Sequence, residues 1–333
     1  MLNSHPRICV PYEAHIYNVF WPWRHHYEPL TDPTNLRRLV CDVLAMRVFR
    51  DWSNPPSVEA VLQRVRRQDF HGVYEAVLRA WADGQGKPRW GEKTPHNSLF
   101  WQAIHEGFPE ANFIHIVRDG RDCALSTIDA RFGPKMVYPA ALRWNRYLNE
   151  LNRMTEALGH ERVFTLKYED LLADPEHCLR SLCEFLGEAY DPAMLEYHRG
   201  PDVYMTDRRN RDNLQRPVLS SNQAKWRKRM STRMLRHFEA IASDNLKRYG
   251  YPLSQDNPIV GAWEHAIYLY LLHPPLRLLA MARNPKGWVD GLVRLKIRGS
   301  ILARDTIRLF SRRQPVDDTD RVSSPPPCQS LHH

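Results

Sequence analysis

The stretch FIHIVRDGRDCALS, Phe113 to Ser126, runs from apolar residues directly into two Arg-Asp pairs around a glycine. The run FIHIV is apolar apart from His115, which is typical of a strand buried on both faces of a parallel sheet. The segment RDCALSTIDARF that follows has the composition of a helix. This stretch therefore predicts one strand-to-helix step of an α/β fold.

The same alternation extends to both sides of this stretch. RWGEK (Arg89–Lys93) predicts a short strand, and Thr94-Pro95 predicts the start of a helix that continues through HNSLFWQAIHEG. Further along, RVFTLKY (162–168) predicts another strand and PEHCLRSLCEFLG (175–187) another helix. A long helix is expected near 139–158, and two earlier helices begin at Asp32-Pro33 and Ser57. Together these elements predict a three-layer α/β/α fold with a central parallel sheet.

The alternation stops after Pro252. We expect an α/β domain over residues 1–252, a basic helical extension over 253–312 and a disordered tail over 313–333. The apolar stretch AIYLYLLHPPLRLLAMA (266–282) is interrupted by prolines and an arginine, which favours a docked amphipathic hairpin. Weak peripheral membrane contact through residues 258–312 is the second interpretation.

The charge of the chain favours acidic ligands. Lys and Arg number 47 against 38 Asp and Glu, a formal charge of +9. The excess is spread along the chain without a basic block, so no nucleic-acid partner is expected. The sixteen histidines and six cysteines show no metal-ligand spacing, and no metal is expected. Because no signal peptide or spanning segment is visible, the predicted location is cytoplasmic.

Three polar residues fall where predicted parallel strands end. Lys93, Arg118 and Tyr168 each close or follow a strand, and Ser126 comes eight positions after Arg118. Ligands of open α/β sheets bind at this edge, next to helix N-termini. One interpretation of RDGRD is a charged turn in which Gly120 supplies an unusual backbone angle, Asp119 or Asp122 caps the helix and the arginines pair with them. The shared edge favours the other interpretation, a phosphate site made by Arg118 and Ser126.

Four motifs in order resemble the sulfotransferase family, whose members use 3′-phosphoadenylyl sulfate. They are LNSHPRICVPYE, GEKTP, FIHIVRDGRDCALS and FTLKYEDLLADP, and the likeness to the bacterial, Golgi and protein-tyrosine branch covers roughly residues 2 to 250. The resemblance implies a fold like that of phosphate-loop NTPases and transfer of a sulfuryl group to an acceptor hydroxyl of a carbohydrate, a tyrosine peptide or a small molecule.

The resemblance also implies roles for single residues. Arg118 and Ser126 match the pair that holds the donor's 3′-phosphate, and Tyr168 matches a residue beside the nucleotide. Lys93 matches the cation near the transferring group, and Glu13 matches the carboxylate that takes the acceptor's proton. Lys225, in AKW, matches a phosphate contact of a later segment that covers the nucleotide. No metal enters this scheme.

Members of the family begin with a strand and a loop such as Pro-Arg-Ser-Gly-Thr-Thr, which binds the 5′-phosphosulfate. No such loop, and no GxxxxGK[ST], is found among the fifteen glycines of this sequence. We expect the first strand and the loop to be encoded upstream of Met1. The alternative is a catalytically inactive anion-binding or interaction protein that keeps the scaffold. A nucleotide kinase is a third candidate, disfavoured by the missing loop.

Overall fold

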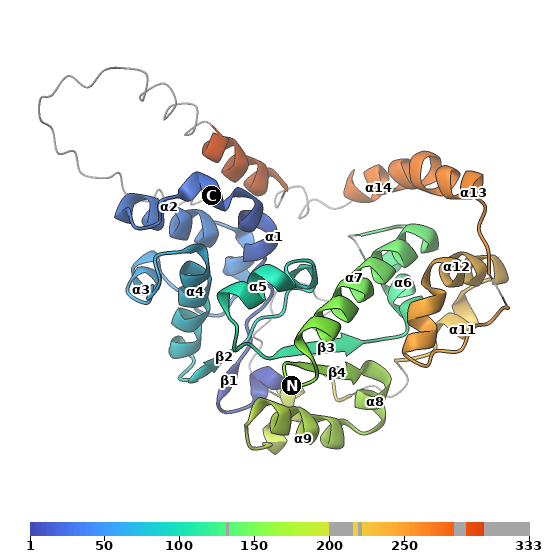
Figure 1. Cartoon of the computed structure of the whole chain (residues 1–333), viewed down its shortest axis with the longest axis horizontal. Helices are drawn as coiled ribbons and strands as arrows, with labels where there is room; N and C mark the ends of the chain where they lie inside the picture. The colour runs from blue at the N-terminus through green and yellow to red at the C-terminus, as the bar shows by residue number, and fades with distance from the viewer. Residues whose placement is uncertain (131–132, 200–215, 219–221, 257, 283–290, 303–333) are drawn as a thin grey trace, which may run out of the picture. The chain divides into compact units, whose positions relative to one another are not determined.

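The computed structural model describes residues 1–130, 133–199, 216–218, 222–256, 258–282 and 291–302 of the chain (Figure 1). The chain divides into two compact units. We call the first the N unit, made of Leu2–Asn97 and, among the later described residues, 291–302. The second, the central unit, comprises Ser98–Gly200 and Asp212–Val289.

The N unit contains one short parallel ladder and a set of helices. Strand β1 (Ile8–Cys9) pairs with β2 (Arg89–Trp90), with Ile8 opposite Arg89 and Cys9 opposite Trp90. Its helices and 3₁₀ turns are η1 (Leu2–Ser4), α1 (Ile16–Phe20), η2 (Trp21–Tyr27), α2 (Pro33–Leu44), η3 (Arg47–Asp51), α3 (Val58–Leu62), α4 (Phe70–Gly84) and η4 (Pro95–Leu99).

Two of the three helix starts predicted in this part of the chain are confirmed. Asp32 accepts a hydrogen bond from the Thr34 amide at 2.7 Å, and Ser57 accepts one from Ala60 at 3.1 Å. The prediction for Thr94 is wrong in detail. Its hydroxyl donates to the half-buried Glu92 instead. The residues after Thr94 form only the 3₁₀ turn η4, and the α-helix begins later, at Trp101.

The central unit is built on a second parallel ladder, in which β3 (Phe113–Val117) pairs with β4 (Val163–Lys167) over five residues. Its helices are α5 (Trp101–Gly107), α6 (Gly120–Asp129), α7 (Val137–Leu158), α8 (Tyr168–Ala173), α9 (Pro175–Leu186), η5 (Pro192–Met194), η6 (Tyr197–Arg199), α11 (Trp226–Arg229), α12 (Thr232–Arg248), α13 (Ala262–Ala266), the π-helix η7 (Ile267–Leu272) and α14 (His273–Ala282).

The prediction of an α/β fold with parallel strands is confirmed. In the described part of the chain the strands form two separate two-stranded ladders, one in each unit. Each ladder joins segments far apart in the sequence, with helices in the intervening chain, as the βαβ pattern requires. The carboxyl ends of the two strands in each ladder therefore lie side by side. Lys93 follows a strand of the N unit at this end, and Arg118 and Tyr168 follow the two strands of the central unit.

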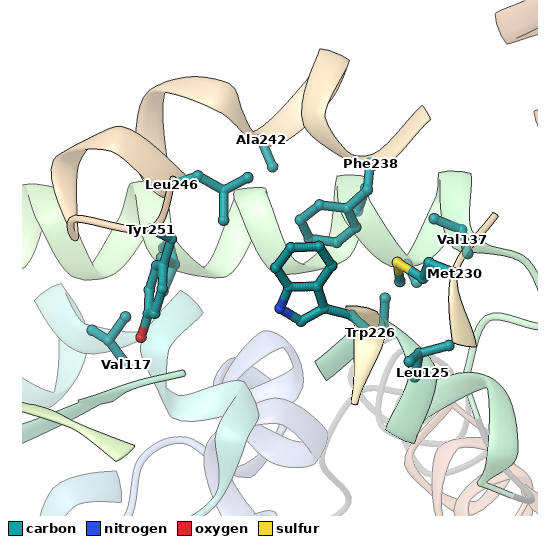
Figure 2. Close-up of a cluster of buried hydrophobic side chains, with 13 residues drawn as sticks. Val117, Leu125, Val137, Trp226, Met230, Phe238, Ala242, Leu246 and Tyr251 are labelled. Atoms are coloured by element: carbon teal, nitrogen blue, oxygen red, sulfur yellow. The ribbon is translucent and has the colours of Figure 1, made fainter. Parts of the chain in front are cut away.

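The core of the central unit lies where α12 packs along α7 and reaches α6 and α11 (Figure 2). Phe238 and Leu246, on one face of α12, are fully buried, and Trp226 of α11 is 7% exposed. Burial of one such side chain contributes about 1.5–3 kcal/mol to the stability of the fold. The packing of these side chains therefore holds α6 and α11 against the long helices. The position of the α6 N-terminus follows from this packing.

Gly120 begins α6, and the structure corrects the reason expected for it. Its backbone does not adopt a left-handed angle. A Cβ atom at this position would instead lie 2.5 Å from the rings of both Trp144 and Phe238. Glycine is needed here because two aromatic side chains pack directly against the start of the helix.

His115 is the polar exception in β3, and it is 1% exposed. Burial, assisted by the positive charge of Arg248, lowers the pKa of His115 to about 4. At neutral pH the imidazole is therefore uncharged and packs edge-on against Tyr249, with ring centres 5.8 Å apart.

The described residues after Gly261 are helical. The predicted hairpin is wrong, since α13, η7 and α14 follow one another without a break. Pro274 and Pro275 lie in the first turn of α14, directly after the π-helical η7, where fewer backbone N–H groups are required as donors. A further helix covers residues 291–302, while residues 303–312 and the predicted tail lie outside the described residues. None of the described helices is long and apolar enough to cross a membrane.

Candidate functional site

Arg118 follows the last residue of β3 and lies beside Tyr168, the first residue after β4. Its guanidinium carbon is 4.5 Å from the centre of the Tyr168 ring, and its Nη2 donates a hydrogen bond to the carbonyl of Asn222 at 2.8 Å. The Asn222 side chain donates in turn to the Tyr168 hydroxyl at 2.7 Å. The two residues predicted at this edge are thus brought together, and Asn222 joins them.

This cluster retains donors that its neighbours do not use. The Nε atom of Arg118 is buried and has no hydrogen-bond partner in the described part of the chain. Leaving such a donor unpaired costs about 1–3 kcal/mol, which an anionic ligand would recover. Ser126, in the second turn of α6, and Lys225, just before α11, are both exposed. These side chains have the chemistry needed to hold a phosphate group.

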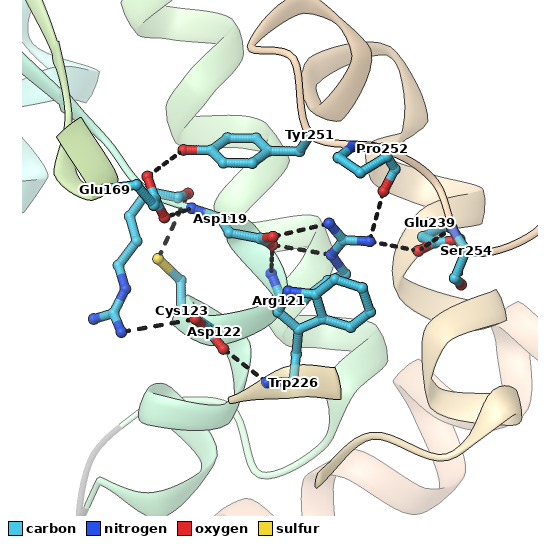
Figure 3. Close-up of polar contacts among 11 residues, drawn as sticks. Asp119, Arg121, Asp122, Cys123, Glu169, Trp226, Glu239, Tyr251, Pro252 and Ser254 are labelled. Carbon is cyan, nitrogen blue, oxygen red and sulfur yellow. Dashed lines mark hydrogen bonds and ion pairs between the residues drawn. The ribbon is translucent and has the colours of Figure 1, made fainter. Parts of the chain in front are cut away.

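The second arginine of RDGRD has a different environment (Figure 3). Arg121 is fully buried, and it donates through Nε and Nη2 to the two carboxylate oxygens of Asp119 at 3.0 and 2.8 Å. Its Nη1 donates to Glu239 and to the carbonyl of Pro252, both at 2.9 Å. The guanidinium also stacks 3.7 Å from the ring centre of Trp226. The charged-turn interpretation therefore holds for Arg121, and it also describes Arg118, whose Nη2 lies 4.0 Å from a carboxylate oxygen of Asp122. The anion-site interpretation of Arg118 stays a prediction, and the unpaired Nε is the donor that it would use.

The network continues from Asp119 and Asp122 to neighbouring elements. Asp119 caps α6 with its side chain, and its own amide donates to Glu169 at 3.0 Å. Glu169 also accepts a hydrogen bond from the Tyr251 hydroxyl at 2.7 Å. Burial is the main cause and this contact the second cause that raise the pKa of Tyr251 far above its usual range. Asp122 accepts from the Trp226 amide at 2.9 Å, which fixes the segment carrying Asn222 and Lys225 onto α6.

Cys123 lies in the same turn of α6, with its sulfur 3.9 Å from the Arg118 carbonyl. Burial raises the pKa of the Cys123 thiol to about 12. The thiol is therefore protonated at neutral pH and adds no negative charge beside the arginine.

In the N unit, Glu13 and Lys93 follow the paired strands β1 and β2 and form an ion pair. The other carboxylate oxygen of Glu13 lies 3.3 Å from Nε2 of His15. Burial alone would raise the pKa of Glu13, but the contacts with His15 and Lys93 outweigh it and lower that pKa to about 2. The Glu13 carboxylate is 20% exposed and the Lys93 side chain 61% exposed, so the acid is held in place while the amine faces solvent.

A second carboxylate, Glu92, fixes the backbone around this pair. It accepts hydrogen bonds from the amide of Ala14 at 3.1 Å and from the side chains of Thr94 and Asn97. Burial raises the pKa of Glu92. The Thr94 hydroxyl also accepts from the His15 amide at 3.2 Å, so the segments that carry Glu13 and Lys93 are joined twice. Neither Glu92 nor His15 was predicted, because a polar residue beside a motif gives no sign of its burial.

Comparison with known proteins identifies the family. The model of the family described as "Sulfotransferase family" matches residues 1–192, which is more than half of the chain. The chain belongs to the sulfotransferase family.

Among curated proteins, this sulfotransferase-family chain is 25% identical over 186 residues to protein-tyrosine sulfotransferase A of Caenorhabditis elegans, covering 54% of the chain and 49% of the relative. It is 28% identical over 145 residues to the omega-hydroxy-beta-dihydromenaquinone-9 sulfotransferase of Mycobacterium tuberculosis, covering 34% of each. The chain thus spans about half, or less, of the length of these relatives.

One solved structure supports the same fold. The sulfotransferase domain of the olefin synthase from Synechococcus PCC 7002 superposes with a TM-score of 0.51 at 21% identity, over 76% of this chain and 88% of that domain. At this identity the likeness concerns the fold alone. It agrees with the predicted sulfotransferase-like α/β architecture.

In this sulfotransferase-family chain, the six predicted site residues fall into two groups. Arg118, Ser126, Tyr168 and Lys225 belong to the central unit, and Glu13 and Lys93 belong to the N unit. Arg118 and Tyr168 are in contact, as are Glu13 and Lys93. Ser126 lies in α6, the helix expected to carry it, and Lys225 directly precedes α11.

Proposed function

We propose that this chain transfers a sulfuryl group from 3′-phosphoadenylyl sulfate to a hydroxyl group of an acceptor. The observation that carries the proposal is the Glu13 carboxylate, held between Lys93 and His15 at the ends of two parallel strands. A fixed carboxylate paired with an exposed amine supplies both a base and a cation, which are the two groups that sulfuryl transfer requires.

In the proposed reaction, Glu13 takes the proton of the acceptor hydroxyl while the acceptor oxygen forms a bond to sulfur. The bond between sulfur and the bridging oxygen of the donor's phosphate breaks, and Lys93 balances the negative charge that develops on that oxygen. With its pKa lowered to about 2, Glu13 is ionised throughout the neutral range. When Lys93 turns from Glu13 toward the leaving oxygen, the carboxylate loses a stabilising charge and its affinity for the acceptor's proton rises.

The central unit supplies the proposed nucleotide contacts. Arg118 offers the unpaired Nε and its charge to the 3′-phosphate, with Ser126 as a hydroxyl donor. Tyr168 borders the nucleotide, and Lys225 adds a second charge from the segment that Asp122 fixes. The proposal specifies only that the acceptor carries a hydroxyl group. The names of two relatives mention a tyrosine and an omega-hydroxylated menaquinone, and a hydroxyl is the group that these two molecules share.

Calorimetry with adenosine 3′,5′-bisphosphate tests the nucleotide contacts. Because Arg118 contributes charge-assisted hydrogen bonds, Arg118→Gln is expected to weaken binding roughly 10- to 100-fold. Arg180→Gln, which removes an exposed arginine from α9 of the same unit, is the matched control and leaves binding unchanged. Equal affinities of the two variants would contradict the assignment.

Transfer of label from radioactive 3′-phosphoadenylyl sulfate to a panel of hydroxyl acceptors tests the chemistry. Glu13→Gln is expected to lower turnover by roughly 10²- to 10⁴-fold. The control is Glu59→Gln, since Glu59 is exposed on α3 and pairs with Arg37 across the surface. Nucleotide binding without any turnover would instead favour a non-catalytic anion-binding protein.

A further inference from the structure

Exposed apolar side chains are concentrated in the last part of the described chain. Thirteen large apolar residues are at least 39% exposed among the described residues, and every one except Ile116 lies between Ile259 and Leu302. The most exposed include Trp263 at 71%, Tyr270 at 78% and Leu271 at 66%. Single exposed apolar residues are normal, but several on one side of a helix mark a surface that contacts something.

Helix α14, in the central unit, contains no buried residue, and the exposed fractions of Leu276, Leu278, Leu279 and Met281 range from 40% to 66%. Arg277 is also exposed on this helix, so α14 presents a cation among its apolar side chains.

The helix at residues 291–302, in the N unit, shows a two-sided pattern. Ile297 and Ile301, one turn apart, are buried at 7% and 3% exposure. Leu292, Leu295 and Leu302 lie along the opposite side and are 60%, 65% and 50% exposed. One side of this helix thus packs on the protein, and the other presents a stripe of leucines outward.

Charges beside the leucine stripe indicate what covers it. Lys296 and Arg298 are exposed on its two flanks, Arg294 is the third cation, and residues 291–302 include no acidic side chain. Protein interfaces are depleted of lysine at their centre. Leucines flanked by long cationic side chains are typical of helices that lie in the headgroup region of a bilayer, with the ammonium and guanidinium groups at the lipid phosphates.

We propose that the helix at residues 291–302 binds anionic lipid bilayers. The leucine stripe of 291–302 rests at the boundary of the acyl chains, and Lys296 and Arg298 contact lipid phosphates. This surface binds without crossing, in keeping with the lengths of the described helices. The proposal does not depend on sulfuryl transfer.

Co-sedimentation of the full chain with vesicles tests the proposal. Binding is expected to vesicles of phosphatidylcholine with phosphatidylglycerol, to be weaker with phosphatidylcholine alone, and to decrease at high salt. Leu292→Gln and Leu295→Gln are each expected to weaken binding about tenfold. Lys296→Gln and Arg298→Gln are each expected to weaken it about fivefold, and only with the anionic vesicles.

Matched controls come from outside the segment. Ile116→Gln changes the mostly exposed apolar residue in the earlier part of the described chain, and Arg153→Gln removes an exposed arginine from α7. Both are expected to bind vesicles like the wild type. Circular dichroism and urea unfolding report whether the leucine variants keep their fold.

Three results would overturn the proposal. The first is that the wild type binds neither type of vesicle, and the second is that the Ile116→Gln control loses as much binding as the leucine variants. The third is a leucine variant that sediments with vesicles like the wild type but loses self-association in analytical ultracentrifugation, which would make the segment an interface between copies of the chain.

Discussion

The guanidinium of Arg121 lies 3.7 Å from the ring centre of Trp226 while Asp119 and Glu239 hold it from two sides. One buried cation thus joins the start of α6, the start of α11 and the helix α12. Because Arg118 immediately precedes this helix start, the packing of Arg121 determines where the proposed phosphate contact lies.

Replacement of Arg121 by methionine is expected to lower the free energy of unfolding by about 3–5 kcal/mol, since it leaves the carboxylates of Asp119 and Glu239 buried without a counter-charge. Urea unfolding monitored by tryptophan fluorescence measures the change. Arg153→Met, which breaks an exposed pair with Glu150, is expected to cost less than about 1 kcal/mol. A similar small loss for Arg121→Met would contradict the assigned role.

Gly120→Ala places a methyl group 2.5 Å from Trp144 and Phe238, so either the rings or the helix start has to move. We expect a loss of about 1–3 kcal/mol in the free energy of unfolding and weaker nucleotide binding. Gly84→Ala is the control, because Gly84 ends α4 with no atom within 4 Å of the added group. That change is expected to be neutral or to stabilise by up to about 1 kcal/mol.

The local pattern of the sequence predicted the elements well. FIHIV is a strand, and helices begin after Asp32 and Ser57, because apolar runs and caps act over a few neighbouring residues. The edge where Arg118 and Tyr168 meet also followed from the rule for parallel strands.

Contacts that join distant residues were not predictable. Glu239 is 118 positions from Arg121, and no local pattern indicates which acidic residue is buried with a given arginine. Glu13 was predicted as a site residue only through the family resemblance, since the residues alone favour a surface carboxylate. Its ion pair with Lys93, 80 positions away, was not predicted. The reason for Gly120 was also wrong, because a sequence does not reveal that two rings pack on one backbone position.

His115 is expected to make stability depend on pH. The folded-state pKa of about 4 lies below the value of 6.5 for an exposed histidine, so between these values the unfolded chain binds a proton that the folded chain does not. The contribution of the neutral His115 is therefore present above pH 6.5 and is lost as the pH falls toward 4.

From pH 7 to pH 5, the wild type is expected to lose about 2 kcal/mol more stability than the variant His115→Phe. Urea unfolding at both pH values measures the difference. His177→Gln removes an exposed histidine from α9 and serves as the control, which should follow the wild type. Parallel curves for the wild type and His115→Phe would mean that the imidazole gains its proton in the folded state as easily as in the unfolded state.

His15 is expected to act on catalysis through Glu13. Because its contact lowers the pKa of Glu13, His15→Asn should raise that pKa from about 2 toward the ordinary 4.5. Asparagine suits the substitution, since His15 has a φ of 56° and asparagine tolerates this left-handed conformation. The acid limb of kcat/KM, which reports ionisation of the free enzyme, should move to higher pH, with little change on the plateau. His160→Asn, at an exposed site, should leave the profile unchanged. A uniform drop of His15→Asn activity at every pH would instead indicate damage to the fold around Glu13, and an unshifted limb would mean that another group is the base.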